Sequence, residues 1–217
     1  MGTETSGPRD VRGAPTVRAA GASRVIRPAN ADAAIALIRK SGRTVVTFAG
    51  FSGAGYEDPA AVERAIAKVL DGLSPASVLI CAGVTPEGIG VVYPLAKKRG
   101  FTTIGVVSAI AEKEGAKFSP DVDTVFVIAD DTWGGLNADG KLSPTSFAMA
   151  GSADEIIAIG GGEITRDEVV AARAMGKKVR YIAADMNHAV AVKKARDKHQ
   201  PEPEDFRGAV HAYFDAK

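Results

Sequence analysis

Residues 44–60 read TVVTFAGFSGAGYEDPA, an uncharged run, a loop of small residues and the start of a helical pattern. A short run dominated by Val, Thr and Phe is typical of a strand that is covered on both faces of a sheet. Asp58 suits the N-cap of a helix and Pro59 suits its first position, so we expect a helix over residues 59–71. This strand–loop–helix unit predicts an α/β fold.

The same alternation continues along the chain. Beyond 44–49, apolar runs predict strands at 77–82, 102–107, 124–128, 155–159 and 178–182. Besides 59–71, helical patterns lie at 30–40, 88–99, 145–152, 166–175, 186–198 and 203–215. Together they predict one doubly wound parallel sheet of about six strands, with helices on both faces, in a single domain over 24–217. Ligands of such folds bind at the carboxyl edge of the sheet, so the loops that follow the strands are the candidate site.

Composition narrows the class of protein. The chain has 217 residues, of which 46% are apolar and 24% charged. Its 27 Lys and Arg residues are balanced by 26 Asp and Glu residues, so we expect neither a nucleic-acid nor a membrane partner. The apolar runs are too short to span a bilayer. Cys81 is the only cysteine, which excludes a disulfide framework and favours a reducing compartment, and we expect a cytoplasmic protein.

Residues 1–23 differ from the rest of the chain. They are rich in Gly, Ala, Arg, Thr and Pro and contain almost no large apolar side chains. Such a segment buries too little surface to offset the entropy of ordering it, so we expect a disordered leader. The alternative is an organellar transit peptide, because the segment contains Arg residues and few acids.

The first glycine-rich loop follows the strand at 44–49. Its small residues are Gly50, Ser52, Gly53 and Gly55. Their spacing is G-x-x-G-x-G, which is not the dinucleotide pattern G-x-G-x-x-G. Two interpretations stay open: a tight turn, or a place where the backbone approaches a ligand.

A second loop, GVTPEGIG, occupies residues 83–90 at the start of the next helix. Gly88 and Gly90 thin the backbone where free N–H groups and the positive end of a helix dipole favour a phosphate. Glu87 lies at the same place, and we favour the simpler interpretation that its charge satisfies the dipole.

The third loop carries the strongest signal, IGGGEITRDE at residues 159–168. Three consecutive glycines, Gly160, Gly161 and Gly162, have a backbone entropy cost that a plain turn does not require. Thr165 and Glu168 have the T-x-x-E spacing of a capping box, in which both side chains bond to the start of a helix. The competing hypothesis is that Glu168 is a functional carboxylate.

The fourth loop, 129–144, is unusually long for a compact domain, which is often a sign of function. It contains Trp133, which either stacks on a base or packs on the core. Asp130 and Asp131 could hold a metal or ribose hydroxyls, although we favour solvated loop carboxylates. Asp139-Gly140 predicts a hairpin turn within GLNADGKL.

Residues 43–185 resemble the Rossmann-like superfamily called SLOG, which includes the "Lonely Guy" phosphoribohydrolases once misnamed lysine decarboxylases. That family carries a Gly-Gly-x-Gly-Thr-x-x-Glu loop that binds the nucleotide phosphate and supplies a catalytic carboxylate. In this chain Gly161, Gly162, Thr165 and Glu168 match the pattern. The resemblance implies a phosphate site at Gly160–Gly162 and Thr165, and Glu168 as the catalytic residue for cleavage of an N-glycosidic bond.

This chain also departs from the family. Ile164 replaces the third glycine, Gly160 replaces the preceding proline, and the helix SPTSFAMAG lacks the family's Arg-Lys pair. The resemblance therefore supports nucleotide binding better than catalysis.

Three functional hypotheses follow from these observations. The first is a nucleotide-binding protein, in which Gly160–Gly162, Thr165, Gly88 and Gly90 bind the phosphate. The nucleoside would lie against Gly50, Ser52, Gly53, Gly55 and Trp133. The second is a phosphoribohydrolase-like enzyme, and the third a non-catalytic carrier or interaction protein for another anionic cofactor. We expect a small-molecule nucleotide as ligand and no required cofactor. Mg²⁺ is possible as a companion of the ligand, but no residue pattern supports it, and the resemblance implies a homo-oligomer.

Overall fold

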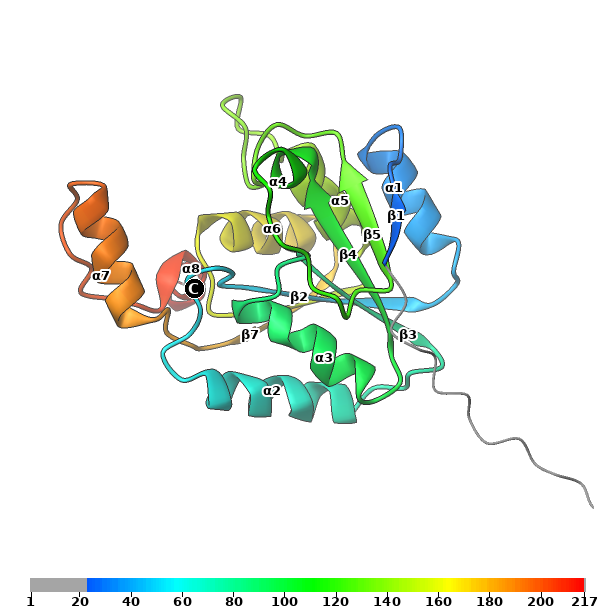
Figure 1. Ribbon diagram of the computed structural model, residues 1–217, viewed down its shortest axis with the longest axis horizontal. Coiled ribbons are helices and arrows are strands. Elements are labelled where there is room, and N and C mark those ends of the chain that lie inside the picture. The colour runs from blue at the N-terminus through cyan, green and yellow to red at the C-terminus, as the bar shows by residue number, and fades with distance from the viewer. Residues whose placement is uncertain (1–22, 217) are drawn as a thin grey trace, which may run out of the picture.

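Seven parallel strands form one sheet in the order β1-β5-β4-β3-β2-β6-β7 (Figure 1). The computed structural model describes residues 23–216, so the predicted leader lies outside the described residues except for Ser23. The strands are β1 (Arg24–Ile26), β2 (Thr44–Gly50), β3 (Val78–Ala82), β4 (Thr102–Ser108), β5 (Thr124–Ile128), β6 (Glu155–Ile159) and β7 (Lys178–Ile182). The predicted doubly wound parallel sheet is confirmed, with one strand more than expected.

Helices cover both faces of the sheet. They are α1 (Ala31–Arg39), α2 (Pro59–Asp71), α3 (Val92–Lys97), α4 (Ala109–Lys113), α5 (Pro144–Ser152), α6 (Glu163–Ala174), α7 (His188–Asp197) and α8 (Gly208–Asp215), with a 3₁₀ turn η1 (Gly88–Val91). Helices α2 and α3 pack on one face, and α1, α5 and α6 pack on the other (Figure 1). Within residues 23–216, none of the helices is long and apolar enough to cross a membrane.

Strand β2 shows how the sequence builds the two layers. Successive side chains of a strand point to opposite faces. Val46 and Phe48 therefore pack with α2 and α3, whereas Val45 packs with α1 and α5, and Ala49 with α5 and α6. Phe48 is fully buried, which stabilises the fold by about 2–3 kcal/mol relative to an exposed ring. A strand that is apolar on both faces needs helices on both sides of the sheet to cover it.

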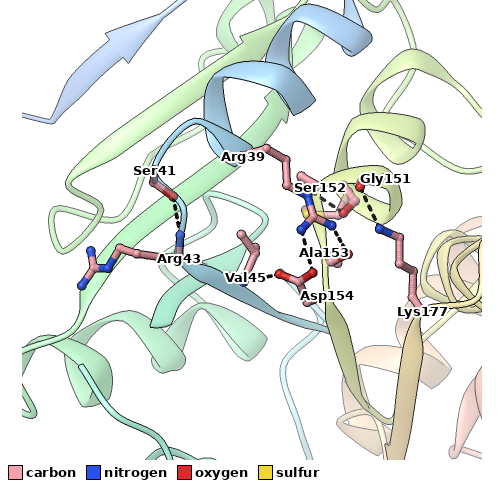
Figure 2. Close-up of polar contacts among 10 residues, drawn as sticks. Arg39, Ser41, Arg43, Val45, Gly151, Ser152, Ala153, Asp154 and Lys177 are labelled. Atoms are coloured by element: carbon pink, nitrogen blue, oxygen red, sulfur yellow. Dashed lines mark hydrogen bonds and ion pairs between the residues drawn. The ribbon is translucent and has the colours of Figure 1, made fainter. Parts of the chain in front are cut away.

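Asp154 lies at the amino edge of the sheet, opposite the carboxyl edge that is expected to bind ligands (Figure 2). Its carboxylate accepts the N–H of Val45 at 2.8 Å and pairs with Arg39 at 2.6 Å. Lys177 donates to the carbonyl of Gly151 at 3.3 Å, near the carboxyl end of α5, where cations are favourable. The contact between Asp154 and Val45 lies at the start of the pairing between β2 and β6.

Two predicted helices differ from those observed. The pattern over 88–99 is divided into η1 and α3. The helix expected over 166–175 begins at Glu163, with Gly162 as its N-cap. The C-terminal tail contains the expected helical segments, α7 and α8.

Candidate functional site

The carboxyl ends of β2 and β6 mark the point where the direction of the chain reverses. From β2 the chain continues through α2 to β3, and from β6 it continues through α6 to β7 on the other side and the other face. Gly50 lies opposite Ile159 in the parallel pairing of the two strands. Open α/β sheets bind ligands in the crevice at such a switch point.

The first turn of α6 begins at this point. Its N-cap, Gly162, makes no side-chain capping hydrogen bond, in contrast to the caps Asn30 of α1 and Asp58 of α2. The first N–H groups of a helix have no partner within the helix, and they form the positive end of its dipole. A Cβ atom added at Gly162 would meet none of the described heavy atoms within 4 Å, so the space beside Gly162 is open.

Loops from three strands meet around this turn. The Thr165 hydroxyl lies 3.4 Å from the carbonyl oxygen of Gly50, at the end of β2. Gly134 and Gly135, from the loop after β5, lie so close to Ile164 that a Cβ on either would come within 3.1–3.3 Å of its side chain. Residues far apart in the sequence thus surround the start of α6.

Close contacts with neighbouring protein atoms explain two of the three consecutive glycines. A Cβ on Gly160, whose φ is +53°, would lie 2.6 Å from the Phe51 ring and 2.5 Å from the Ala184 carbonyl oxygen. A Cβ on Gly161, whose φ is +123°, would lie 3.0 Å from Val210 of α8. Both glycines are therefore required by internal packing, whether or not a ligand binds.

The loop at 83–90 packs against the loop after β2. A side chain on Gly88 would collide with the carbonyl of Phe51, and one on Gly90 with the carbonyl of Thr85. Glu87 is exposed and is the N-cap of η1, but its side chain makes no capping hydrogen bond. Gly88 thus lets the two loops approach each other, and Gly90 lets the loop at 83–90 fold back on itself.

Glu168 is not part of a capping box, so that interpretation is wrong. Helix α6 begins before Thr165, and the Glu168 carboxylate accepts a 2.8 Å hydrogen bond from the Ser146 hydroxyl of α5. Glu168 is only 6% exposed. Burial raises its pKa to about 7, the Ser146 hydrogen bond opposes this increase, and the charge of Asp167 adds to it.

The loop after β5 is tied to this buried pair. The Gly135 N–H donates to the Ser146 hydroxyl oxygen at 2.8 Å, and the Leu136 N–H donates to Asp167 at 3.2 Å. Arg166 pairs with the other oxygen of Asp167 at 2.8 Å. Ser146 and Asp167 were not predicted from the sequence. The signal that could have found them is the pair Gly134-Gly135, since consecutive glycines favour a close approach of the backbone.

Asp130 is a correction to our expectation of solvated carboxylates. It is buried and accepts the N–H groups of Thr145 and Thr132, both at 2.9 Å, so it fixes the two ends of the loop. Asp131 is exposed and pairs with Lys113. Within residues 23–216, no group of three or more His, Cys, Asp or Glu side chains is placed to hold a metal ion.

The remaining loop residues lie on the surface. Trp133 is 55% exposed, so it does not pack in the core. The predicted turn at Asp139-Gly140 is present, closed by a bridge between Leu136 and Leu142.

Two hollows lie beside the switch point, on the α2 side of the sheet. One, of about 280 Å³, lies between α2 and the ends of β6 and β7. The other, of about 390 Å³, is lined by Gly55, Gly88 and Val190 among others, and Tyr56 borders both hollows. Ser52 and Gly53 are exposed on the loop next to them.

Comparison with solved structures gives distant similarities. The Moco carrier protein from Chlamydomonas reinhardtii is 20% identical, with 64% of this chain and 76% of that chain covered and a TM-score of 0.48. A structural-genomics target named TM1055 is 21% identical, with 63% of this chain and 72% of that chain covered and a TM-score of 0.47. The DNA processing protein DprA from Streptococcus pneumoniae is 15% identical, with 66% of this chain and 51% of that chain covered and a TM-score of 0.44. No protein-family model and no curated protein matches this sequence. The resemblance to the Lonely Guy family thus stays a prediction, and the functional argument rests on the residues of this chain.

Substitution distinguishes a glycine that is required by packing, Gly160, from a glycine that faces open space, Gly162. We expect Gly160→Ala to lower the free energy of unfolding by about 2 kcal/mol or more, because of its positive φ and its contact with Phe51. Gly162→Ala is expected to change it by less than about 1 kcal/mol. Urea unfolding of both variants measures the difference. Equal losses would contradict the assignment of Gly160 to packing.

The buried Glu168 predicts how stability depends on pH. Since its pKa in the folded protein, about 7, exceeds the ordinary value of 4.5, its contribution is complete below pH 4.5 and is lost as pH rises to about 7. The size of this loss is on the order of 3 kcal/mol. Glu168→Gln should remove that component from the pH profile of urea unfolding, and Glu163→Gln, on the exposed first turn, should not. An unchanged profile in Glu168→Gln would contradict the burial argument.

Proposed function

We propose that this protein binds a nucleotide or a related phosphorylated nucleoside at the carboxyl edge of its sheet, with the phosphate at the first turn of α6. The observation that carries the proposal is the uncapped start of α6 at the switch point, with open space in front of Gly162. Free N–H groups and the helix dipole favour an anion there.

The predicted phosphate residues divide into two groups in this proposal. Gly162 and the N–H groups that follow it meet the ligand directly. The other glycines shape the loops, because a side chain at any of them would collide with neighbouring protein atoms; they are Gly160, Gly161, Gly88 and Gly90. Thr165 is buried, and its hydroxyl lies close to the Gly50 carbonyl, so its contribution to the ligand comes through its N–H group.

The nucleoside would lie beyond the phosphate, on surfaces that the loops leave accessible. Ser52 and Gly53 are exposed, Gly55 lines the 390 Å³ hollow, and Trp133 offers an exposed aromatic face. Stacking of a base on an aromatic ring is worth about 1–3 kcal/mol. A homo-oligomer, a cytoplasmic location and the alternative of a carrier for another anionic cofactor stay predictions.

A second function, cleavage of an N-glycosidic bond, is favoured by one observation. Glu168 has a pKa of about 7, which suits a group that gives or takes a proton near neutral pH. Protonated Glu168 could donate to the departing base, and ionised Glu168 could stabilise the positive charge that develops on the sugar. Because the carboxyl is buried, this function requires the loop after β5 to move.

Nucleotide binding is measured by calorimetry with a panel of mononucleotides and dinucleotides. We expect Gly162→Val to reduce the affinity at least about tenfold while leaving the melting temperature nearly unchanged, because its side chain enters open space in front of the helix. Gly162→Ala serves as the smaller matched substitution. The absence of binding by every member of the panel at millimolar concentration would refute the proposal.

Catalysis is tested separately, by release of free base from nucleoside 5′-monophosphates. If the protein is a hydrolase, Glu168→Gln should lower the rate by at least about a hundredfold with nucleotide affinity retained. Glu163→Gln is the control for loss of one carboxylate on the same helix. Binding without any base release by the unmodified protein would leave the binding function and reject the enzyme.

A further inference from the structure

The loop between β5 and α5 is held on α6 by a short segment, Gly134–Leu136, which we call the latch. The latch lies over the Ser146 hydroxyl: a Cβ on Gly134 would come within 2.9 Å of that oxygen. Both of its glycines have positive φ, +114° and +81°, so the close approach depends on residues without side chains. Of its three N–H groups, those of Gly135 and Leu136 bond to Ser146 and Asp167.

Ser146 links the latch to Glu168. Its hydroxyl accepts the Gly135 N–H and donates to the Glu168 carboxylate, both at 2.8 Å. Ser146 is fully buried and Glu168 almost fully, so water reaches neither group while the latch is in place. The latch is also the part of the loop that adjoins the first turn of α6, through Ile164.

We propose that the latch is a proton-sensitive gate of the candidate site, which closes over neutral Glu168 and opens when Glu168 ionises, with Ser146 as the positioning residue that joins the two. This inference rests on the proposed function only for the identity of the site that the gate serves. The opening itself needs no ligand.

The sign of the effect follows from solvation. Burial disfavours the ionised carboxylate, and hydration after opening restores it, so ionisation and opening favour each other. The titratable groups that act on Glu168 are few among the described residues. Asp167 acts from the same helix, where it is itself paired with Arg166. The Cys81 thiol of β3 interacts with Glu168 from the sheet. Neither supplies a cation to hold an ionised Glu168 in the closed state.

An open gate would connect the two parts of the proposed site. The phosphate position at the start of α6 is accessible in the closed structure, whereas the Glu168 carboxyl is not. Opening of the latch would bring Glu168 within reach of a ligand that is already bound by its phosphate. Trp133, next to the latch, would move with it.

The experiment is hydrogen exchange of individual amides, measured by NMR on the full chain without nucleotide from pH 5 to 8.5. Protection factors, corrected for intrinsic exchange, should fall for Gly135 and Leu136 by up to about tenfold per pH unit as pH rises from about 5 toward 7, and should level off above that pH. The Gly140 amide, which closes the local turn by bonding to Asn137, should show no such fall. Emission of Trp133, the single tryptophan, should change over the same pH range.

Variants identify the group that titrates. In Glu168→Gln the protection of Leu136 should be independent of pH, and Glu163→Gln should keep the original profile. Ser146→Ala removes a hydrogen bond that lowers the pKa of Glu168, so the fall at Leu136 should continue to higher pH before it levels off. A flat profile in the unmodified protein, or a pH-dependent one in Glu168→Gln, would overturn the gate. Since no nucleotide is used, this result is independent of whether calorimetry detects binding.

Discussion

The parallel pairing of β2 with β6 is the constraint on which the rest of the site depends. It joins residues about a hundred positions apart in the chain, from Val46 opposite Glu155 to Gly50 opposite Ile159. Asp154 fixes its amino end by accepting the Val45 N–H. Because the chain leaves these two strands in opposite directions, their carboxyl ends cannot both be covered by the same crossover. A crevice at this place is therefore a consequence of topology.

Phe51 then determines how much of the crevice is left. Its ring occupies the space where a side chain at Gly160 would lie, and it also approaches Gly208 at the start of α8. The protein thus uses glycines to admit an aromatic ring of its own, and the accessible space is displaced toward Gly162 and the hollows beside Tyr56. Some glycines in these loops are therefore required by packing within the protein. Fewer of them are left to contact a ligand than the number of glycines in the loops suggests.

Local signals in the sequence were sufficient for most of the fold. The cap Asp58 and the alternating apolar runs predicted α2 and six of the seven strands, since both signals act over a few neighbouring residues. Strand β1 has only three residues, too few for a periodic pattern. Helix α4 has only five residues, and it was also missed.

The site was less predictable because its contacts are made between distant segments. The T-x-x-E spacing predicted a cap, yet Glu168 bonds to Ser146, a residue on another helix. Asp130 was expected in solvent, but the N–H of Thr145, at the start of α5, draws its carboxylate inward. The convergence of the loops after β2, β3 and β6 was correctly expected, because the topology of a parallel sheet brings them to one edge.

The two electrostatic features of the site support each other. An anion at the first turn of α6 would stand about one helical turn from Glu168, and a nearby negative charge raises the pKa of a carboxyl group. A bound phosphate therefore favours neutral Glu168, and neutral Glu168 favours the closed latch. By linkage, protonation of Glu168 must in turn favour phosphate binding. A site with this arrangement would hold an anionic ligand under a closed loop at lower pH and expose Glu168 to it as the pH rises.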